Sequence, residues 1–418
     1  MPGLPHTAIF TDNDSRKGEL ANRLLRGDPP GVLSNLKGLS GELFSNTRIA
    51  VFLEEEARHD RSDLHLKDNR KLASFSSGER KKALLRHLLS RSPDFLVLDN
   101  LFDNLDHESR KQLELQLHAL SSKVILVQLL NRTEDLLPFI RRRACLVGAD
   151  LTGFPDYEPP GPAVLKNQPF SKELPPPPYL YGSQPEVLVE FNKVNLTYKE
   201  LPILHELTWK VLRGSFWELK GPNGSGKTSL ITMINGDNPK AYGQEIFLFG
   251  NRKGSGESVW DIKERIGYFT PSITDRFRGN HRASHMLISG ITDSVGLYIK
   301  PTDRQVHLAN RWLELLGMES LGNVLFRSLT EGQQRLLMCA RAMIKHPPLL
   351  ILDEPTAGLD EASSRMLITL VRKMALESEA AIIFVSHREE PGLKADHVLE
   401  LIPDINGSRG VVRNNLKA

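Results

Sequence analysis

The chain has 418 residues, enough for two or three domains, and its 40% hydrophobic and 25% charged residues are typical of globular proteins with sizeable cores. With 54 Lys and Arg against 51 Asp and Glu, the net charge of +3 argues against a general polyanion-binding surface. The two cysteines, Cys145 and Cys339, lie far apart in the sequence, which makes a disulfide framework and a structural zinc site unexpected and favours a reducing compartment.

The first half contains four motifs in an order that recurs later in the chain. They are the loop TDNDSRKGEL (residues 11–20), the stretch SFSSGERKKALLRHLL (74–89), the segment DFLVLDNLFDNLD (94–106) and the apolar run VILVQLL (124–130). The apolar run within 95–98 is short enough to be a buried strand rather than a membrane span. We assign residues 1–150 to a first domain.

A proline-rich segment separates the two halves. Residues 151–186 contain ten prolines, including four in a row at 175–178. Such a segment favours extended, semi-rigid conformations and excludes a helix or a central strand. We interpret it as an interdomain linker; a functional proline-rich docking peptide is the alternative.

The second half, residues 187–418, begins its set of motifs with GPNGSGKT (221–228), directly after an apolar run and before a helix-compatible one. This fits the pattern G-x-x-x-x-G-K-[ST], in which glycines let backbone N–H groups turn inward around phosphate oxygens at a helix N-terminus. Lys227 would reach the β- and γ-phosphates and Thr228 would ligate Mg²⁺. A glycine-rich turn with a chance match is the alternative. The candidate phosphate-binding residues are Gly221, Pro222, Asn223, Gly224, Ser225, Gly226, Lys227, Thr228 and Ser229.

Three further polar residues follow apolar runs in the second half. Asp353 and Glu354 come after LLIL, where a carboxylate can hold the Mg²⁺ shell while its neighbour polarises the attacking water; an exposed acidic turn is the alternative. His387 follows IIFVS, a place from which it would contact the γ-phosphate, although a lone histidine after a strand is often structural. Short apolar runs alternating with helical patterns predict an α/β fold with ligands at the carboxyl ends of parallel strands.

The spacing of these motifs indicates an internal repeat. From Thr330 to Asp353 is 23 residues, as it is from Ser76 to Asp99. The repeat is shortened elsewhere, because 103 residues separate Lys227 from Thr330 and only 59 separate the corresponding Lys17 from Ser76. We therefore expect two P-loop domains in tandem, the first one truncated.

The motifs resemble those of the ATP-binding cassette (ABC) ATPases: phosphate loop, signature helix, Asp-Glu strand end, D-loop (Leu359, Asp360) and switch histidine. The stretch FGNRKGSGESVWDIKERIGYF (249–269), GYFTPS and SLTEGQQR are similar more narrowly to tandem-cassette ModF/PhrA-type ATPases without membrane domains. The likeness covers residues 186–405 closely and the first half in outline. It implies ATP as ligand, Mg²⁺ as cofactor and ATP hydrolysis as activity.

The resemblance also implies how the two halves cooperate. In this family two cassettes pair head to tail, and each ATP lies between one phosphate loop and the opposite signature. The competent site would then combine residues 221–228, Asp353, Glu354 and His387 with Ser76, Ser77 and Gly78 of the first half. Tyr198 matches the aromatic residue that stacks on adenine; a core tyrosine of an edge strand is the alternative.

The second half departs from the family pattern at two places. The glutamine expected after IGYF is absent, and Thr270, Pro271 and Ser272 stand there. The signature reads Leu-Thr-Glu-Gly-Gln at 329–333, with Glu331 where glycine is usual. The altered glutamine loop weakens any inference of coupling to a transporter.

The first half has lost most of its catalytic side chains. Aligning its loop on GPNGSGKT keeps Asn13, Ser15 and Lys17, but glycines become Thr11, Asp14 and Arg16, and the Mg²⁺-binding hydroxyl becomes Gly18. The catalytic glutamate becomes Asn100, and the histidine becomes Leu129, which lies 30 residues after Asp99, whereas His387 lies 34 residues after Asp353. Acidic side chains repel a triphosphate, and side chains at 14 and 16 fill the nest. We expect no hydrolysis at this site; nucleotide binding there stays open.

The sequence favours a soluble, asymmetric ATPase that switches an unknown protein or ribonucleoprotein partner. The alternatives are a ribosome- or nucleic-acid-associated ABC factor and the ATP-binding subunit of a transporter. No apolar run approaches the roughly 20 residues of a membrane span, and the N-terminal stretch lacks an apolar leader. We expect the cytoplasm or an organelle matrix, with mitochondrial import left open.

Overall fold

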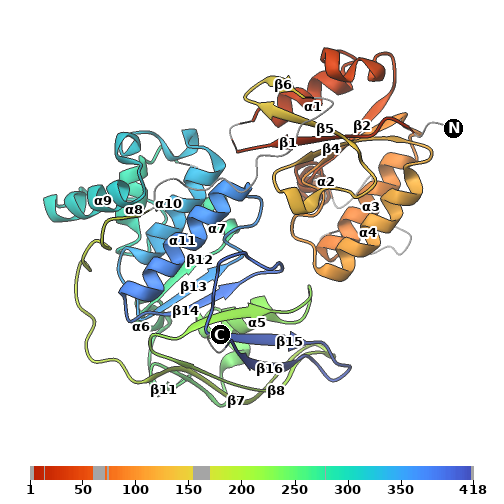
Figure 1. The fold of residues 1–418 in the computed structure, drawn as a ribbon. Coiled ribbons are helices and arrows are strands. Elements are labelled where there is room, and N and C mark those ends of the chain that lie inside the picture. Colours follow the sequence, from red (N-terminus) through yellow and green to blue (C-terminus); the bar gives the residue numbers. More distant parts are fainter. Residues whose placement is uncertain are drawn as a thin grey trace. The chain divides into compact units, whose positions relative to one another are not determined.

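The chain forms two compact units in a computed structural model that describes residues 4–13, 15–59, 71–72, 75–153, 170–277 and 279–415 (Figure 1). The first unit comprises residues 1–163 with the short segment 358–362, and the second comprises residues 164–357 and 363–418. Asp14 and residues 154–169 of the predicted linker lie outside the described residues.

The first unit is a six-stranded sheet with helices on both faces. Its elements are β1 (Thr7–Thr11), α1 (Lys17–Leu25), β2 (Gly41–Phe44), α2 (Asn46–His59), α3 (Ser77–Leu89), β3 (Phe95–Asp99), α4 (His107–Leu120), β4 (Ile125–Leu130), β5 (Arg142–Val147) and β6 (Asp150–Thr152). The central strands β1 and β4 are buried along their whole length, as expected for parallel strands covered on both faces. Because alternate residues point to opposite faces, Ile9 packs with α1 while Ala8 and Phe10 pack with α2, α3 and α4.

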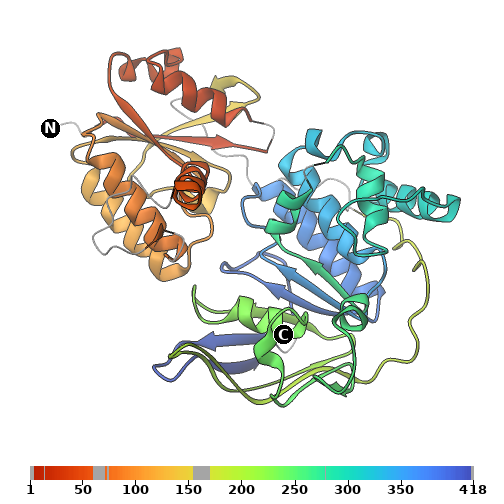
Figure 2. The ribbon, with the colours of Figure 1, turned by 180° about the vertical axis from the view of Figure 1, so that it is seen from behind.

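The second unit contains two sheets. Its elements are β7 (Val187–Tyr198), β8 (Leu201–Leu212), β9 (Phe216–Lys220), α5 (Lys227–Ile234), β10 (Ile246–Leu248), β11 (Asn251–Arg252), α6 (Val259–Glu264), β12 (Ile266–Phe269), α7 (Pro271–Arg276), α8 (Ala283–Ser289), α9 (Asp303–Leu315), α10 (Glu331–Met343), β13 (Leu349–Asp353), α11 (Glu361–Glu377), β14 (Ala381–Val385), β15 (His397–Ile402) and β16 (Arg409–Asn414). Both views place α5 between the antiparallel sheet β11-β10-β7-β8 and the six-stranded sheet (Figures 1 and 2). Leu230 and Ile231 of α5 belong to the core that joins them.

The six-stranded sheets of the two units have the same topology. Their strand orders are β2-β3-β4-β1-β5-β6 and β12-β13-β14-β9-β15-β16, and in each sheet all neighbours are parallel except the last pair. The repeat predicted from the motifs is therefore present in the fold. The second unit has β7 and β8 before β9, and β10, β11 and α6 before β12. Between β12 and α10 it has α7, α8 and α9, where the described part of the first unit has α2.

The described end of the predicted linker packs against the second unit. His346 Nε2 lies 2.7 Å from the carbonyl oxygen of Pro175, and the N–H of Leu174 donates to Glu377 Oε2 at 3.0 Å. Burial lowers the pKa of His346 more than this carbonyl raises it. At its other end, residues 150–152 form strand β6, so the first residues assigned to the linker belong to the sheet of the first unit. The segment predicted as a linker therefore also makes hydrogen bonds with the second unit, through Leu174 and Pro175.

Candidate functional site

The phosphate loop of the second unit joins the end of β9 to the start of α5. Gly221 has φ +151°, and a Cβ there would lie 2.6 Å from Ser225 Oγ and 2.8 Å from the Leu401 carbonyl oxygen. Gly226 has φ +98°, and its Cβ would lie 2.9 Å from side-chain carbons of Ile203 and Leu204. Only glycine fits both positions, because each combines a left-handed backbone with a close approach of neighbouring atoms. The sequence has glycine at the places where this loop requires it.

Lys227 begins α5 and folds back over the loop. Its Nζ donates to the carbonyl oxygens of Gly221 at 2.6 Å and Pro222 at 2.9 Å, and the residue is 6% exposed. Ser225 Oγ is buried without a hydrogen-bond partner among the described residues. An ammonium group and a buried hydroxyl inside a loop of left-handed glycines are groups that phosphate oxygens can engage.

Two carboxylates stand side by side where β13 ends. Burial, and then the neighbouring charge of Glu354, raise the pKa of Asp353 to about 6, against the opposing charges of His387 and Lys227. A hard divalent cation would remove this repulsion, and carboxylate and hydroxyl oxygens are its preferred ligands. Asp353, with the exposed hydroxyl of Thr228 in the first turn of α5, therefore fits a magnesium site.

Glu354 is held in an unusual backbone conformation and paired with His387. Its φ is +48°, and its N–H donates to the carbonyl oxygen of Val385 at 3.0 Å. Its carboxylate accepts a hydrogen bond from His387 Nε2. Burial would raise the pKa of Glu354, but this bond and the positive charges of His387, Lys227 and Arg335 outweigh burial and lower it. Non-glycine residues with φ above zero cluster at functional sites, where the surrounding structure compensates the strain.

The comparisons with known proteins agree with this geometry. Residues 204–357 match the family described as ABC transporter. The chain is 37% identical over 350 residues to the ABC transporter ATP-binding protein ModF of Escherichia coli (strain K12), a match that covers 80% of this chain and 71% of that protein. The chain belongs to the ABC ATPases. As a member of this family it binds and hydrolyses ATP.

Two further matches extend the comparison. An uncharacterized ABC transporter ATP-binding protein of Schizosaccharomyces pombe is 29% identical over 364 residues, which cover 85% of this chain and 73% of that protein. A solved nucleotide-free ATP-binding cassette from an ABC transporter is similar with a TM-score of 0.46 and 20% identity, covering 55% of this chain and 91% of that one.

The residues predicted to form the signature, Ser76, Ser77 and Gly78, lie at the start of α3 in the first unit. Ser76 is the N-cap of α3: its Oγ accepts from the N–H of Glu79 at 3.2 Å, and the Glu79 carboxylate accepts from the N–H of Ser76 at 2.8 Å. Ser77 Oγ donates to the Asn104 carbonyl oxygen at 2.8 Å. A Cβ on Gly78 would lie 2.8 Å from Ser109 Oγ, so glycine is needed where α3 passes α4. Thr330 caps α10 of the second unit with the same kind of capping box.

The predicted adenine contact, Tyr198, is at the end of β7. It is 40% exposed, so it is not a core residue, and its hydroxyl accepts from Asn238 Nδ2 at 2.8 Å. Lys240 Nζ lies 5.6 Å from the ring centroid. Tyr198 pairs with Leu201 where β7 turns into β8, and the adenine contact stays a prediction.

In the first unit, side chains at the position of the phosphate loop bond to other residues of the same unit. The Ser15 hydroxyl donates to the Asp12 carboxylate at 2.7 Å and accepts from the N–H of Asp12 at 3.0 Å. Lys17 Nζ lies 3.6 Å from Asp99 Oδ1 and 3.5 Å from Asn131 Oδ1. Two of the side chains that the sequence retained, Ser15 and Lys17, are therefore engaged by other residues of the first unit.

The predicted match of His387 with Leu129 is wrong. In the sheets, Leu129 pairs with Asp99 as Val385 pairs with Asp353. His387 lies two residues after Val385, so its counterpart is Asn131. Sequence spacing could not correct the match, because the helices that precede these strands differ in length: α4 has 14 residues and α11 has 17. The first unit thus has an amide in place of the imidazole.

Sequence reasoning missed a pair of buried cations at corresponding positions of the two units, Lys81 in α3 and Arg335 in α10. They are 2% and 8% exposed. The signal was a positive charge five residues after Ser76 and, again, five residues after Thr330.

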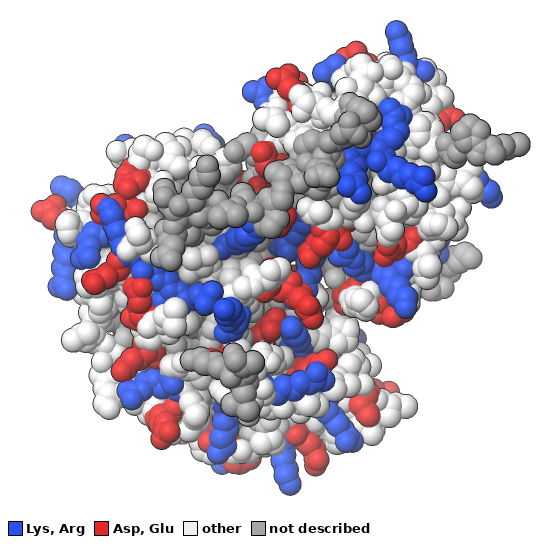
Figure 3. Space-filling view, viewed as in Figure 1, with Lys and Arg blue, Asp and Glu red and all other residues white. Residues whose placement is uncertain are grey.

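The described residues that face the viewer in Figure 3 carry charges of both signs. Among the described residues, no helix combines the length and apolar character needed to cross a bilayer. On the face of the second unit seen in Figure 3, lysines and arginines are interspersed with aspartates and glutamates. A mixed surface of this kind lacks the single-signed field that attracts polyanions.

Proposed function

We propose that this ABC ATPase hydrolyses MgATP at one composite site and uses the cycle to switch an unknown partner. The second unit supplies the phosphate loop, Asp353, Glu354 and His387, and the first unit supplies the signature Ser76, Ser77 and Gly78 that completes the site. The main support is a contrast: the second unit pairs Glu354 with His387, whereas the first unit has Asn100 and Asn131 at these positions.

The proposed reaction is transfer of the γ-phosphoryl group to water. Glu354 orients the water and accepts its proton, and His387 holds both the γ-phosphate and the Glu354 carboxylate in place. Lys227 leaves the carbonyls of Gly221 and Pro222 to bind the β- and γ-phosphates. These groups act by positioning and by stabilising charge, which is how phosphoryl-transfer enzymes obtain most of their rate. Tyr198 stacks on the adenine.

The magnesium ion would be held by Thr228 and Asp353. When bound, it supplies positive charge to the phosphate oxygens. The adjacent carboxylates of Asp353 and Glu354 favour this assignment, because burial of two neighbouring carboxyl groups without a cation raises the pKa of Asp353.

The first-unit site does not hydrolyse ATP in this proposal. Asn100 cannot act as a base, Gly18 offers no hydroxyl to a metal, and Lys17 is engaged by Asp99 and Asn131. A preserved signature beside a defective phosphate loop is the arrangement expected of a unit that activates its partner site without turning over ATP itself.

The test compares the Glu354→Gln and Asn100→Asp variants of the full chain. Glutamine keeps the size of Glu354 but is not a base, so ATP should still bind while steady-state turnover falls by roughly 100-fold or more. Asn100→Asp returns a carboxylate to the first unit and should leave turnover unchanged. Normal turnover in Glu354→Gln, or increased turnover in Asn100→Asp, would contradict the proposal.

The partner is to be sought with the same variant. Glu354→Gln with ATP should hold the chain in its closed state, so affinity capture should retain a protein or ribonucleoprotein that wild-type protein releases. We propose a location in the cytoplasm or an organelle matrix, in keeping with the free cysteines Cys145 and Cys339.

A further inference from the structure

The two units share a buried cation on the helix that follows the signature. Lys81 in α3 lies five residues after Ser76, and Arg335 in α10 lies five residues after Thr330. Their exposures of 2% and 8% are unusual for such residues, which are almost never fully buried unless their charge is compensated. Burying a positive charge costs free energy, and both copies of the repeat bury one at this position, which indicates that the charge has a function.

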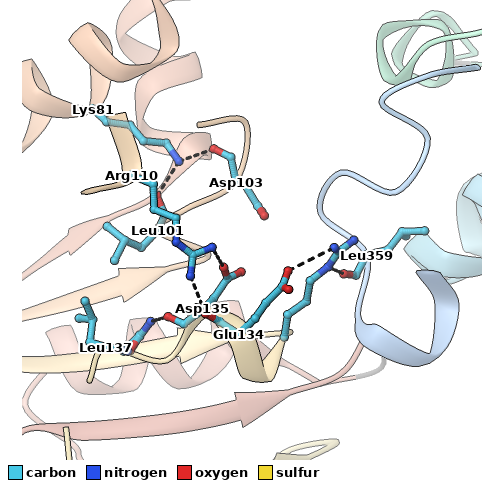
Figure 4. A network of polar contacts seen from close by, with 10 residues as sticks. Lys81, Leu101, Asp103, Arg110, Glu134, Asp135, Leu137 and Leu359 are labelled. Atoms are coloured by element: carbon cyan, nitrogen blue, oxygen red, sulfur yellow. Dashed lines mark hydrogen bonds and ion pairs between the residues drawn. The ribbon is translucent and has the colours of Figure 1, made fainter. Parts of the chain in front are cut away.

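In the first unit the cation binds the loop that leaves β3. Lys81 Nζ donates to the carbonyl oxygens of Leu101 at 2.7 Å and Asp103 at 2.6 Å, and Figure 4 shows its side chain reaching both. On the other side of this loop, Arg110 of α4 lies 4.5 Å from the ring centroid of Phe102. The loop directly after Asp99 and Asn100 is thereby fastened to the signature helix.

The corresponding loop of the second unit has the same backbone geometry. The N–H of Asp103 donates to the Asn100 carbonyl at 3.2 Å, and the N–H of Ala357 donates to the Glu354 carbonyl at 3.2 Å. Asn100 and Glu354 both have positive φ, +42° and +48°. The loop that Lys81 binds is therefore the counterpart of the loop that begins with the proposed catalytic glutamate.

In the second unit, Arg335 lies near the strand ends that lead into this loop. Its guanidinium carbon is 5.7 Å from the ring centroid of Phe269, the last residue of β12, which pairs with Leu352 just before Asp353. Its outer nitrogen is 3.7 Å from the exposed carboxylate of Glu331. The charge of Arg335 also contributes to lowering the pKa of Glu354. Its guanidinium thus lies near the end of β12, whose neighbour β13 carries Asp353 at its own end.

We infer that Arg335 is a positioning residue for ATP hydrolysis, which fixes the loop of Glu354 to the signature helix α10. Its buried guanidinium keeps the Glu354 carboxylate in the place where it meets water and His387. This inference rests on the proposed role of Glu354. In the first unit, Lys81 binds the corresponding loop, which carries Asn100 instead of a glutamate, so the role of Lys81 is structural.

The test uses steady-state ATP hydrolysis by the full chain with Arg335→Met, Arg335→Lys and Arg304→Met. Methionine fills the apolar part of the space without a charge, and lysine restores the cation that the first unit uses. Arg304 is an exposed arginine of α9, so Arg304→Met controls for the loss of one positive charge. Thermal unfolding and ATP binding are measured for each variant, so that loss of folding is separated from loss of turnover.

Arg335→Met should lower kcat roughly 10- to 100-fold, the cost of misplacing a catalytic group, while the KM for ATP changes less than about twofold. Arg335→Lys should recover most of kcat, and Arg304→Met should match wild type. The inference is overturned if Arg335→Met keeps wild-type kcat, or if lysine and methionine lower kcat equally, because packing alone would then explain the loss.

A parallel measurement of Glu354→Gln separates this inference from the proposed function. Normal turnover in Glu354→Gln removes the proposed role of Glu354 and, with it, the basis of the inference. Lost turnover in Glu354→Gln together with wild-type kcat in Arg335→Met leaves the proposed function standing and overturns the role of Arg335 alone.

Discussion

Lys227 Nζ and the carbonyl oxygen of Gly221, six residues earlier, are joined by a 2.6 Å hydrogen bond within one loop. The ammonium group that is to bind phosphate is therefore already placed over the nest before ATP arrives. We predict that Lys227→Ala weakens ATP binding by roughly 10- to 100-fold, since a hydrogen bond to a charged group contributes about 1.5–3 kcal/mol. Titration calorimetry with ATP and magnesium measures the loss.

The matched control for this prediction is Lys17→Ala in the first unit. Lys17 is engaged by Asp99 and Asn131, so its removal should leave the ATP affinity unchanged. Equal losses of affinity in Lys17→Ala and Lys227→Ala would show that both loops bind nucleotide and would contradict a single functional site.

Acidification should destabilise the second unit through His346. Burial lowers the pKa of His346 below its ordinary value of 6.5, so the unfolded chain takes up a proton before the folded one does. The stability that depends on neutral His346 is complete above about pH 6.5 and is lost as the pH falls toward the lowered pKa. His346→Gln keeps an N–H donor for Pro175 without titrating, so its melting temperature should fall less between about pH 7.5 and 5.5.

His307→Gln is the matched control for the pH experiment, because His307 is exposed on α9. It should show the same decline as wild type. An unchanged decline in His346→Gln would show that another group controls the acid sensitivity.

Local motifs allowed the phosphate loop and the catalytic strand end to be predicted. The left-handed glycines, Lys227 and the first turn of α5 are neighbours in the chain, so their spacing encodes their geometry directly. The runs before Asp353 and His387 are apolar because both faces of their strands are covered. These apolar runs allowed the α/β sheet to be predicted from the sequence. The structure places these parts in one unit, as the repeat predicted.

Contacts across long stretches of sequence were not predictable in this way. The counterpart of His387 was misplaced because helix length varies between the repeats while sheet register does not. His346 and Pro175 are 171 residues apart, and composition reveals only that the linker is extended. The role of Arg335 depends on Phe269 and on the turn after Glu354, so a lone arginine in a helical pattern could not be distinguished from a surface charge.

Gly226→Ala should destabilise the second unit and abolish ATP binding. The added Cβ would lie 2.9 Å from Ile203 and Leu204, at a φ of +98° that alanine rarely adopts. The combined strain should cost about 2–4 kcal/mol of unfolding free energy, measured by urea denaturation. Gly18→Ala in α1 is the control: no atom lies within 4 Å of its Cβ, so alanine should stabilise the helix by about 0.5–1 kcal/mol.

Lys81→Met should destabilise the first unit although it touches no nucleotide-binding residue of the second. The ammonium is the donor to the carbonyl oxygens of Leu101 and Asp103, and its loss leaves these buried acceptors without that donor. We expect a loss of about 1–3 kcal/mol in urea denaturation and a smaller loss for Lys81→Arg, which keeps the charge. Lys82→Met is the control on the same helix, because the Lys82 ammonium bonds Gln112 at the surface. If Lys81→Met and Lys82→Met unfold at the same urea concentration as wild type, the hydrogen bonds from Lys81 to the loop after β3 contribute nothing to the stability of the fold.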